Sequence, residues 1–319
     1  MLTNILKDRR TKSIFLIVIG VAIIIFLVIN LGQKQVTTIV FAGDLLLDRG
    51  VRERVEHLGM NSLFDPSIDD FFSNKDIVIA NLECPATKIK EPINKKFIFR
   101  AEPEWLQSLR DHGITHLNMA NNHAMDQGRR GLVDTHATII ENGLIPLGFG
   151  KNTSNACKAQ LIATEPRNVY VLSSLQVPSE NWVYLEDRPC VCEDSFDDIS
   201  HNIKEIKSKD NSAVVIIQLH WGAEHRLEPM TLQKQQAHQL IDAGADVIIG
   251  HHPHTVQTTE IYKEKPIYYS IGNFIFDQRK PINSRGLLVR LEIKESTLHY
   301  TPIGIDIKKC VPRVISLQE

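Results

Sequence analysis

Five short apolar runs of the sequence are each followed directly by side chains that can bind a metal ion. Asp44 follows the run 37–42 through Gly43, and Glu83 follows the run 77–80. Asn81 also follows the run 77–80, and Asn121, Asn122 and His123 follow the run 116–119. His220, Trp221 and Glu224 follow the run 214–219, and His251, His252 and His254 follow the run 247–249. In an open α/β sheet, ligands bind at the ends of such strands, so we expect these side chains to meet there.

The chemistry of this set is that of a catalytic metal site. Carboxylate, imidazole and amide oxygen together suit manganese, zinc or ferrous iron, and the absence of cysteine from the set argues against a structural zinc. A bound divalent ion lowers the pKa of a coordinated water and neutralises charge on a phosphoryl or carbonyl oxygen. The sequence therefore predicts a divalent metal ion in a hydrolase-type site.

Each of these residues, taken alone, also has an ordinary structural explanation. Asp44 can cap a helix, Asn122 can occupy a left-handed turn, and His123 or His220 can be a hydrogen-bonded histidine of the core. The run from His252 to His254 is harder to explain by packing, because histidine is costly to bury.

The elements that must position these residues alternate between strands and helices. The apolar runs 37–42, 77–80, 116–119, 169–172, 214–219, 247–249 and 267–270 are typical of strands buried on both faces. Helical spacing and terminal glycines predict helices at 105–111, 131–142 and 232–243. This order predicts an α/β fold. The tail from 286 to 307 alternates like antiparallel strands, which indicates a mixed sheet, and 177–198 is predicted to be a surface insertion.

Composition limits the classes of protein that the chain can belong to. Its 319 residues fit one large domain, and a net charge of -2 excludes a strongly basic nucleic-acid binder, so no nucleic-acid partner is expected. Five cysteines without a C-x-x-C pair predict neither a disulfide framework nor a zinc knuckle. Cys190 and Cys192 are too close together for an unstrained mutual disulfide.

The N-terminal region predicts a membrane anchor. Residues 14–31 are apolar except for Gly20 and Asn30. A helix of this length is about long enough to cross the hydrocarbon core of a membrane. Four basic residues precede this run: Lys7, Arg9, Arg10 and Lys12. Their position predicts that residues 1–13 lie in the cytoplasm and residues 35–319 outside the cell membrane. Residues 30–33 offer no small-residue cleavage site, so a single-pass anchor in contact with membrane lipid is favoured over a cleaved signal peptide.

Six stretches of the chain resemble the successive motifs of the CapA/PgsA family of poly-γ-glutamate capsule proteins. They are FAGDLLLDRG at 41, NLE at 81, NMANNHAMDQG at 118, QLHWGAEH at 218, GHHPHTVQ at 250 and YSIGNFIFDQ at 269. That family is similar to the calcineurin-like metallophosphoesterases. The resemblance implies a metallophosphoesterase-like sandwich of mixed β-sheets flanked by helices, with poly-γ-glutamate as ligand and membrane synthase or export subunits as partners.

Carried over by position, the resemblance also implies a ligand set. One ion would be held by Asp44, Glu83 and His254, and a second by Glu83, Asn122, His220 and His252. Leu46 stands where the phosphoesterases have a histidine, so the first site is expected to be weaker and the chain to hold one or two ions. His123 matches the residue that contacts the substrate and protonates the leaving group, with Asp126 placed to orient it.

A basic segment follows the Glu83 motif and predicts how a polyanion would be bound. Five cations lie within 88–100 beside the single acid Glu91: Lys88, Lys90, Lys95, Lys96 and Arg100. Their field can steer a polycarboxylate toward the site, with Lys95, Lys96 and Arg100 as substrate-binding residues and Arg100 as a bidentate carboxylate binder. The alternative is a solvated loop whose lysines only maintain solubility. Asn273, after the run 267–270, is expected to line the site.

Three functions remain open at this point. The chain can handle poly-γ-glutamate during capsule synthesis or export, as the resemblance implies. It can be an extracytoplasmic metal-dependent phosphoesterase or other hydrolase, which the ligand set favours chemically. It can also be a non-catalytic scaffold subunit of a membrane synthase complex.

Overall fold

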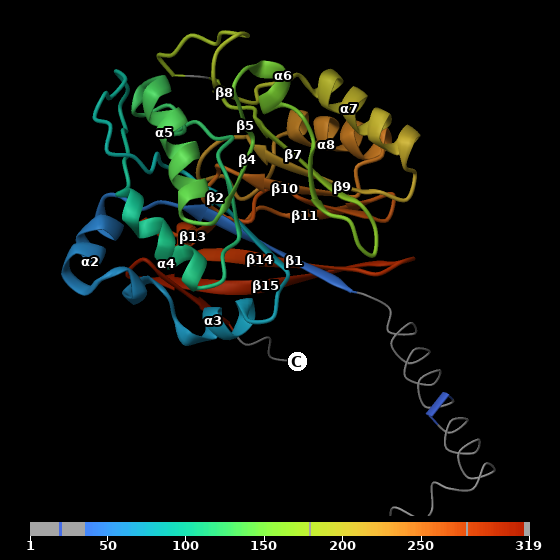
Figure 1. Ribbon diagram of the computed structural model, residues 1–319, viewed down its shortest axis with the longest axis horizontal. Coiled ribbons are helices and arrows are strands. Elements are labelled where there is room, and N and C mark those ends of the chain that lie inside the picture. The colour runs from blue at the N-terminus through green and yellow to red at the C-terminus, as the bar shows by residue number, and fades with distance from the viewer. Residues whose placement is uncertain (1–18, 21–35, 179, 279, 316–319) are drawn as a thin grey trace, which may run out of the picture.

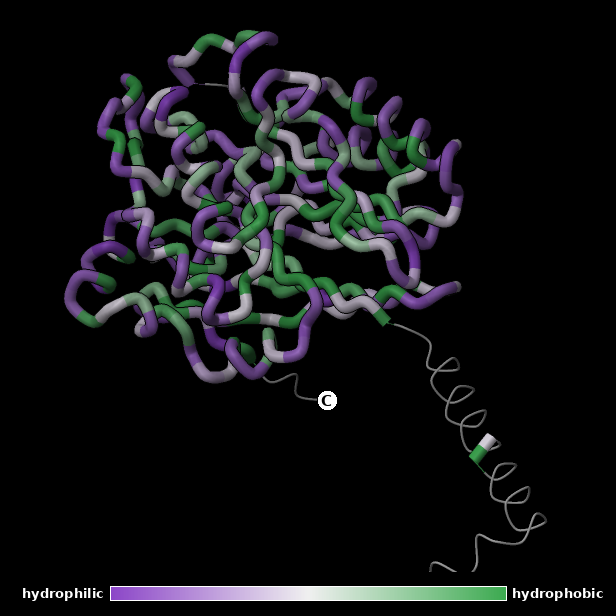
Figure 2. The backbone as a smooth tube through the Cα atoms, in the orientation of Figure 1, coloured by the Kyte–Doolittle hydropathy of each residue, from purple (hydrophilic) through white to green (hydrophobic). Residues whose placement is uncertain are grey.

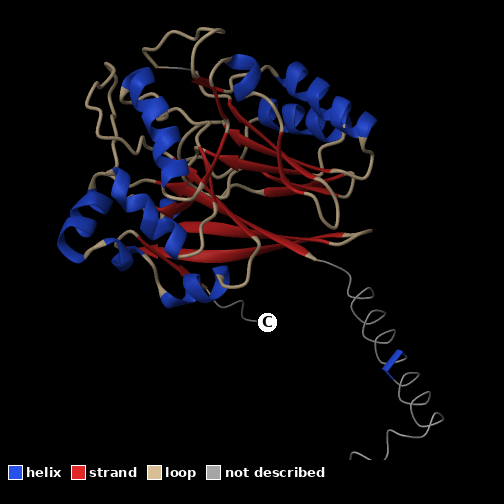
Figure 3. Ribbon diagram, viewed as in Figure 1, coloured by secondary structure: helices blue, strands red, loops and turns tan. Residues whose placement is uncertain are grey.

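Two β-sheets stacked face to face form the centre of the molecule, and helices cover their outer faces (Figure 1, Figure 3). The computed structural model describes residues 19–20, 36–178, 180–278 and 280–315. Both sheets contain parallel and antiparallel pairs. The prediction of an α/β fold with mixed sheets flanked by helices is therefore confirmed.

The first sheet has the strand order β16-β15-β14-β1-β2-β3-β4, with β13 also paired to β1. Strands β1 to β4 run parallel to one another, whereas β14 runs antiparallel to β1. The bounds of its strands are β1 (Thr37–Leu45), β2 (Ile77–Leu82), β3 (His116–Asn118), β4 (Ile145–Leu147), β13 (Asn273–Ile275), β14 (Arg285–Ile293), β15 (Leu298–Lys308) and β16 (Val311–Val314).

The second sheet has the order β11-β12-β10-β9-β7-β6. Its central strands β7, β9, β10 and β12 are parallel, with antiparallel partners at both edges. The bounds are β6 (Gln160–Ala163), β7 (Val169–Leu175), β9 (Val214–His220), β10 (Val247–His251), β11 (Thr259–Tyr262) and β12 (Lys265–Tyr268). A separate two-stranded ribbon pairs β5 (Phe149–Gly150) with β8 (Cys190–Val191).

Three apolar layers hold the sheets and helices together. Between the sheets, Phe41 and Ile79 pack in one cluster with Ile216 and Ile249. The outer face of the first sheet packs against α2 (Gly50–Leu58), α3 (Pro66–Phe72), α4 (Leu106–Asp111) and α5 (Gly128–Glu141), and that of the second against α7 (Phe196–Lys209) and α8 (Thr231–Ala243). Because both faces of each sheet are covered, the central strands are buried and mostly apolar (Figure 2).

The predicted elements agree with the structure, with small shifts at their ends. All seven predicted strands are present, although 267–270 is observed as β12 at Lys265–Tyr268. The helices predicted at 105–111, 131–142 and 232–243 correspond to α4, α5 and α8, and the predicted antiparallel tail forms β14 and β15. Helices α2, α3 and α7 were not predicted.

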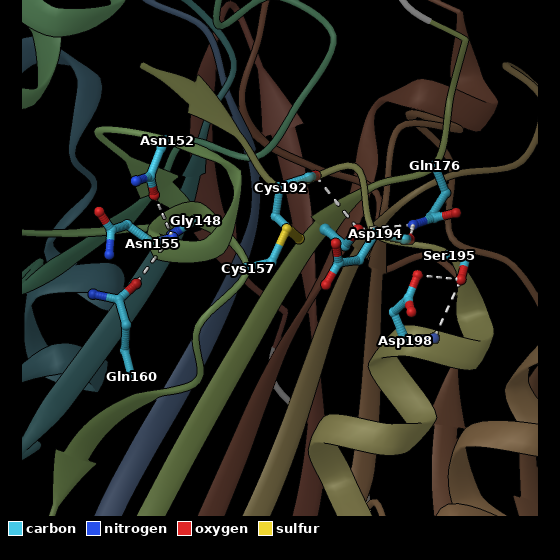
Figure 4. The surroundings of a disulfide bond; sticks show 11 residues. Gly148, Asn152, Asn155, Cys157, Gln160, Gln176, Cys192, Asp194, Ser195 and Asp198 are labelled. Atoms are coloured by element: carbon cyan, nitrogen blue, oxygen red, sulfur yellow. Dashed lines mark hydrogen bonds between the residues drawn. A yellow bond between two sulfur atoms is a disulfide. The ribbon is translucent and has the colours of Figure 1, made fainter. Parts of the chain in front are cut away.

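A disulfide joins Cys157 to Cys192, a pairing that the sequence did not predict (Figure 4). Cys157 directly follows α6 (Thr153–Ala156), and Cys192 directly follows β8. Because β8 pairs with β5 just before α6, two cysteines 35 residues apart come together. A disulfide typically stabilises a fold by about 2–4 kcal/mol. Residues 190–192 of the predicted surface insertion are accordingly buried.

The predicted anchor at 14–31 and the tail at 1–13 lie outside the described residues, except for Ile19 and Gly20. Within the part of the chain that the structure describes, no helix has both the length and the apolar character that crossing a membrane requires. The anchor and its orientation stay predictions.

Candidate metal centre

Polar side chains from both sheets meet at the carboxyl ends of the parallel strands. In the first sheet, Asp44 of β1 lies in register with Asn81 of β2 and with Asn273 of β13. In the second sheet, His220 of β9 lies in register with His251 of β10. Asn81 Nδ2 lies 3.2 Å from His220 Nδ1, so side chains of the two sheets are in contact at this point.

Two glycines allow the strand ends to approach their neighbours this closely. A Cβ atom on Gly43 would stand 2.0 Å from the carbonyl oxygen of Gly272, and one on Gly250 would stand 1.9 Å from that of Tyr269. Any other residue at either position would push the strand away. Glycine therefore precedes both Asp44 and the histidine run 251–254 because backbone passes directly against backbone there.

Two groups of ligand-type side chains form around one shared carboxylate. Glu83, His220 and His252 offer ligand atoms that all lie within 4.8 Å of one another, and so do Asp44, Glu83 and His254. Glu83 Oε1 is 3.7 Å from Nε2 of both His220 and His254. Asn122 Oδ1 lies 2.8 Å from His220 Nε2. The structure thus brings together the two sets that the resemblance implied, although their role as ligands stays a prediction.

The buried atoms of the two groups fit a divalent cation. Glu83 is fully buried, and neither of its carboxylate oxygens has a hydrogen-bond partner among the described residues. His252 Nδ1 is also buried without a partner within the same residues. Buried carboxylates are otherwise paired with donors or bound to metals, because an unpaired buried charge is costly. These buried groups could therefore hold a metal ion.

Burial and mutual charge set the protonation of the ligands in the absence of metal. Burial raises the pKa of Glu83 well above its usual value and lowers the pKa of His252 to about 4. Burial would also lower the pKa of His254, but the charges of Glu83 and Asp44 outweigh it and raise that pKa to about 9. His254 therefore holds a proton at neutral pH that a bound metal ion must displace.

Three polar side chains surround the carboxylate of Asp44. Its Oδ1 accepts from Asn81 Nδ2 at 2.8 Å, and its Oδ2 lies 3.1 Å from His254 Nδ1. His251 Nδ1 also lies 3.3 Å from Oδ1, a contact that the sequence did not predict. Leu46, at the position where the resemblance implies a missing ligand, is buried in the apolar core. The repeated histidines of the 250 motif were the only signal for His251.

The backbone of the histidine run adopts a conformation that is uncommon for residues with a side chain. His252 has a φ of 95° and His254 a φ of 55°. Such angles cost energy and persist where the surrounding structure holds them, often at functional sites. Here His252 lies beside His220, with ring centroids 4.8 Å apart, and His254 lies beside Asp44. The strained turn thus supplies one histidine to each ligand group.

An asparagine network supports the first sheet's contribution. Asn81 Oδ1 accepts from Asn118 Nδ2 at 3.0 Å and from Asn121 Nδ2 at 3.3 Å. These bonds orient the amide so that its Nδ2 faces Asp44 and His220. Asn118 had no predicted role, because it lies within a strand rather than after it.

His123 stands beside the ligand groups with one ring nitrogen fixed. Its Nδ1 lies 2.8 Å from Asp126 Oδ2, and since a carboxylate can only accept, Nδ1 donates. Its Nε2 lies 4.0 Å from Glu83 Oε1. Burial lowers the pKa of His123 by more than Asp126 raises it, so the ring is neutral at neutral pH. Nε2 is then a free proton acceptor that faces the candidate metal ligands.

Comparison with known proteins assigns the family. Residues 38–278 match the family model described as bacterial capsule synthesis protein PGA_cap. The chain belongs to this family. It is 30% identical to the PGA biosynthesis protein CapA of Bacillus subtilis (strain 168), over 98% of this chain and 85% of that protein. It is 29% identical to the capsule biosynthesis protein CapA of Bacillus anthracis, over 86% of this chain and 68% of that protein.

More distant likenesses extend to other proteins. A probable polyglutamine synthesis accessory protein of Mycobacterium tuberculosis (strain ATCC 25618 / H37Rv) is 27% identical over 77% of this chain and 76% of that protein. A hypothetical protein from Thermus thermophilus superposes with a TM-score of 0.49 at 13% identity, covering 85% of this chain and 100% of that one. The sulfate thiohydrolase SoxB of the same genus superposes with a TM-score of 0.44 at 10% identity, covering 81% and 41%.

In this PGA_cap family member, the predicted polymer-binding cations do not lie together as one exposed patch. The side chain of Lys95 is buried, with its Nζ 2.9 Å from Asp126 Oδ1 and donating to the Asn122 carbonyl at 2.8 Å. Arg100 donates to the Thr87 carbonyl and to Glu102. Lys96 is exposed, with its Nζ 5.0 Å from the centroid of the Phe97 ring. Their role in binding polymer stays a prediction.

The remaining candidates divide between site and core. Asn273 Oδ1 lies 3.0 Å from His254 Nδ1, which places this residue beside the ligand groups. Trp221 belongs to the apolar core, where its Nε1 donates to the Tyr269 carbonyl at 2.9 Å. Glu224 is half-exposed near His225.

Proposed function

We propose that this chain acts on poly-γ-glutamate during capsule synthesis or export, as a metal-dependent hydrolase that binds and cuts the polymer at the outer face of the cell membrane. One observation carries the proposal: a fully buried glutamate without a hydrogen-bond partner among the described residues is shared by two groups of candidate metal ligands, in a chain of the capsule synthesis family. The Bacillus subtilis relative is a PGA biosynthesis protein, which supports the choice of polymer.

The chain's own residues provide the remaining parts of a hydrolytic site. A divalent ion bound by the two groups would supply an activated water and polarise the carbonyl of the bond to be cut. His123 Nε2, with Nδ1 fixed by Asp126, can accept a proton or return it to the leaving amine. Lys95 compensates the buried charge of Asp126 and so supports this orientation. Membrane synthase or export subunits are the expected partners.

We expect the metal-loaded full-length protein to shorten γ-linked glutamate oligomers, as followed by mass spectrometry of the products. A chelator should stop the reaction, and His123→Ala should slow it by about 10²–10⁴-fold, the usual contribution of a general acid or base. His299→Ala, at an exposed position of β15, is the matched control and should leave the rate unchanged. Metal-dependent binding without cleavage would instead indicate a non-catalytic subunit, and cleavage of phosphodiesters alone would indicate a phosphoesterase.

The outward location is part of the proposal, and the disulfide between Cys157 and Cys192 supports it. Disulfides persist in oxidising compartments and are rare in the cytosol. The basic residues before the apolar run 14–31 favour the same orientation.

An engineered thiol tests this location. Asp187→Cys, at a side chain that is 81% exposed, should react with a membrane-impermeant thiol reagent in intact cells. Asp8→Cys, in the predicted cytoplasmic tail, should react only after lysis. The parent chain measures the background from its own cysteines. Labelling of position 187 only after lysis would place the domain inside the cell and reject the outward location.

A further inference from the structure

Arg49 lies at the edge of the candidate metal centre, although no role was predicted for it. It follows the Asp44 motif in the turn between β1 and α2, where its φ is 53° and its ψ is -128°. This conformation is uncommon for a residue with a side chain and has to be held by its surroundings. Asp48 Oδ1 accepts from the Arg49 amide at 2.8 Å, and Asp48 Oδ2 accepts from the Arg100 amide at 2.8 Å.

The guanidinium group of Arg49 is placed between two aromatic rings. Its Cζ lies 5.3 Å from the ring centroid of Phe99 and 5.5 Å from that of Phe276. The Phe99 ring in turn contacts His123, at 4.2 Å between centroids, and the Phe276 ring contacts His254, at 4.7 Å. The Phe99 ring therefore lies between Arg49 and His123, and the Phe276 ring lies between Arg49 and His254.

One edge of this guanidinium is occupied and the other is available. Nε donates to Asp277 Oδ2 at 3.1 Å and Nη2 donates to Asp277 Oδ1, while the Gly50 amide donates to the same carboxylate at 3.2 Å. Nη1 has no hydrogen-bond partner in the residues that the structure describes, and the side chain is 34% exposed. Asp277 thus fixes the plane of the group and leaves its Nη1–Nη2 edge open.

We propose that Arg49 recognises a carboxylate of the polymer beside the metal centre. This inference rests on the proposed function and extends it, because it names the residue that positions the chain to be cut. Each repeat of a γ-linked glutamate polymer carries a free carboxylate, and a planar guanidinium edge binds a carboxylate with two parallel hydrogen bonds. The stacked rings hold the group in place before the ligand arrives, which lowers the entropy cost of binding.

Fluorescence anisotropy with a labelled short γ-linked glutamate oligomer tests the inference on the metal-loaded full-length protein. Arg49→Gln should weaken binding by about tenfold to a hundredfold, the loss expected for hydrogen bonds to a charged group. Arg49→Lys should recover only part of the affinity, because lysine keeps the charge but not the planar edge. Metal content and the thermal transition, measured on each variant, show whether the site and the fold are intact.

Arg313→Gln is the matched control. Arg313 forms the same kind of pair, with Nε and Nη2 each 2.9 Å from Asp65 Oδ2, at the exposed position of β16. The Arg313→Gln variant should bind the oligomer with the same affinity as the parent protein. If Arg49→Gln also binds like the parent, the inference is overturned while the proposed function stands. If Arg49→Gln weakens binding of inorganic phosphate but not of the oligomer, the carboxylate assignment is overturned. If the parent binds no oligomer at all, the proposed function fails, and this inference with it.

Discussion

Glu83→Gln is expected to abolish metal binding at both ligand groups. Glu83 is the one residue common to the two groups, and its amide replacement has a similar size but no negative charge. Loss of an outer-shell partner alone typically lowers metal affinity by about 10–100-fold, so loss of a shared direct ligand should exceed that range. Elemental analysis after incubation with manganese or zinc measures the occupancy, with Glu205→Gln on the exposed face of α7 as control.

The same substitution should have opposite effects on the metal-free and metal-loaded proteins. Without metal, glutamine removes a buried carboxylate that has no hydrogen-bond partner in the described residues, so the variant should be at least as stable as the parent. With metal, only the parent gains stability, because only its folded state binds the ion. In the parent, metal affinity should rise from neutral pH toward about 9, the pKa of His254, because binding expels the proton that His254 holds. A variant that keeps the parent's metal stoichiometry would refute the shared ligand.

Lys95→Met is expected to lower the free energy of unfolding by about 3–5 kcal/mol, the usual result of removing one partner of a buried ion pair. The side chain of Lys95 is 2% exposed and that of Asp126 is fully buried, so the substitution leaves a carboxylate uncompensated beside His123. Lys96→Met, at the exposed neighbouring position, is the matched control and should change stability little. Urea denaturation measures the free energy of unfolding of both variants, provided that its dependence on urea concentration has the same slope in each.

The double variant Lys95→Met with Asp126→Asn separates the ion pair from simple packing. Because it removes both charges, it should recover much of the stability lost in the single variant. The pKa of His123 should rise in Lys95→Met, since burial lowers it now and the charge of Lys95 adds to that lowering. If Lys95→Met and Lys96→Met are equally stable, Lys95 is not part of the site's support and belongs with the solvated lysines.

The features that the sequence predicted depend on local pattern. The strand 214–219 is recognisable because every residue except Gln218 is apolar. The candidate ligands after it are recognisable because they directly follow its end. The grouping of those ligands into two sets came from the family resemblance. No spacing along the chain shows that Glu83 lies between His220 and His254, because those contacts form across two sheets.

The features that the sequence did not predict depend on tertiary contacts. Lys95 and Lys96 have the same chemistry and adjacent positions, yet only the fold buries one of them against Asp126. The disulfide depends on the pairing of β5 with β8, each only two residues long. Helix α7 was missed because its apolar residues Ile199 and Ile203 follow an acidic stretch that has the composition of a surface loop.

The division of the candidate ligands between the two sheets has a consequence for how the molecule opens. Glu83 follows a strand of the first sheet, whereas His220 ends β9 of the second sheet and His252 and His254 follow its strand β10. An ion bound between them would join the two layers, so separating the sheets would require losing the ion. Sub-global opening of one sheet alone would then be suppressed. Amide hydrogen exchange in β2 and β9 should slow together on metal loading, as in a single cooperative unit.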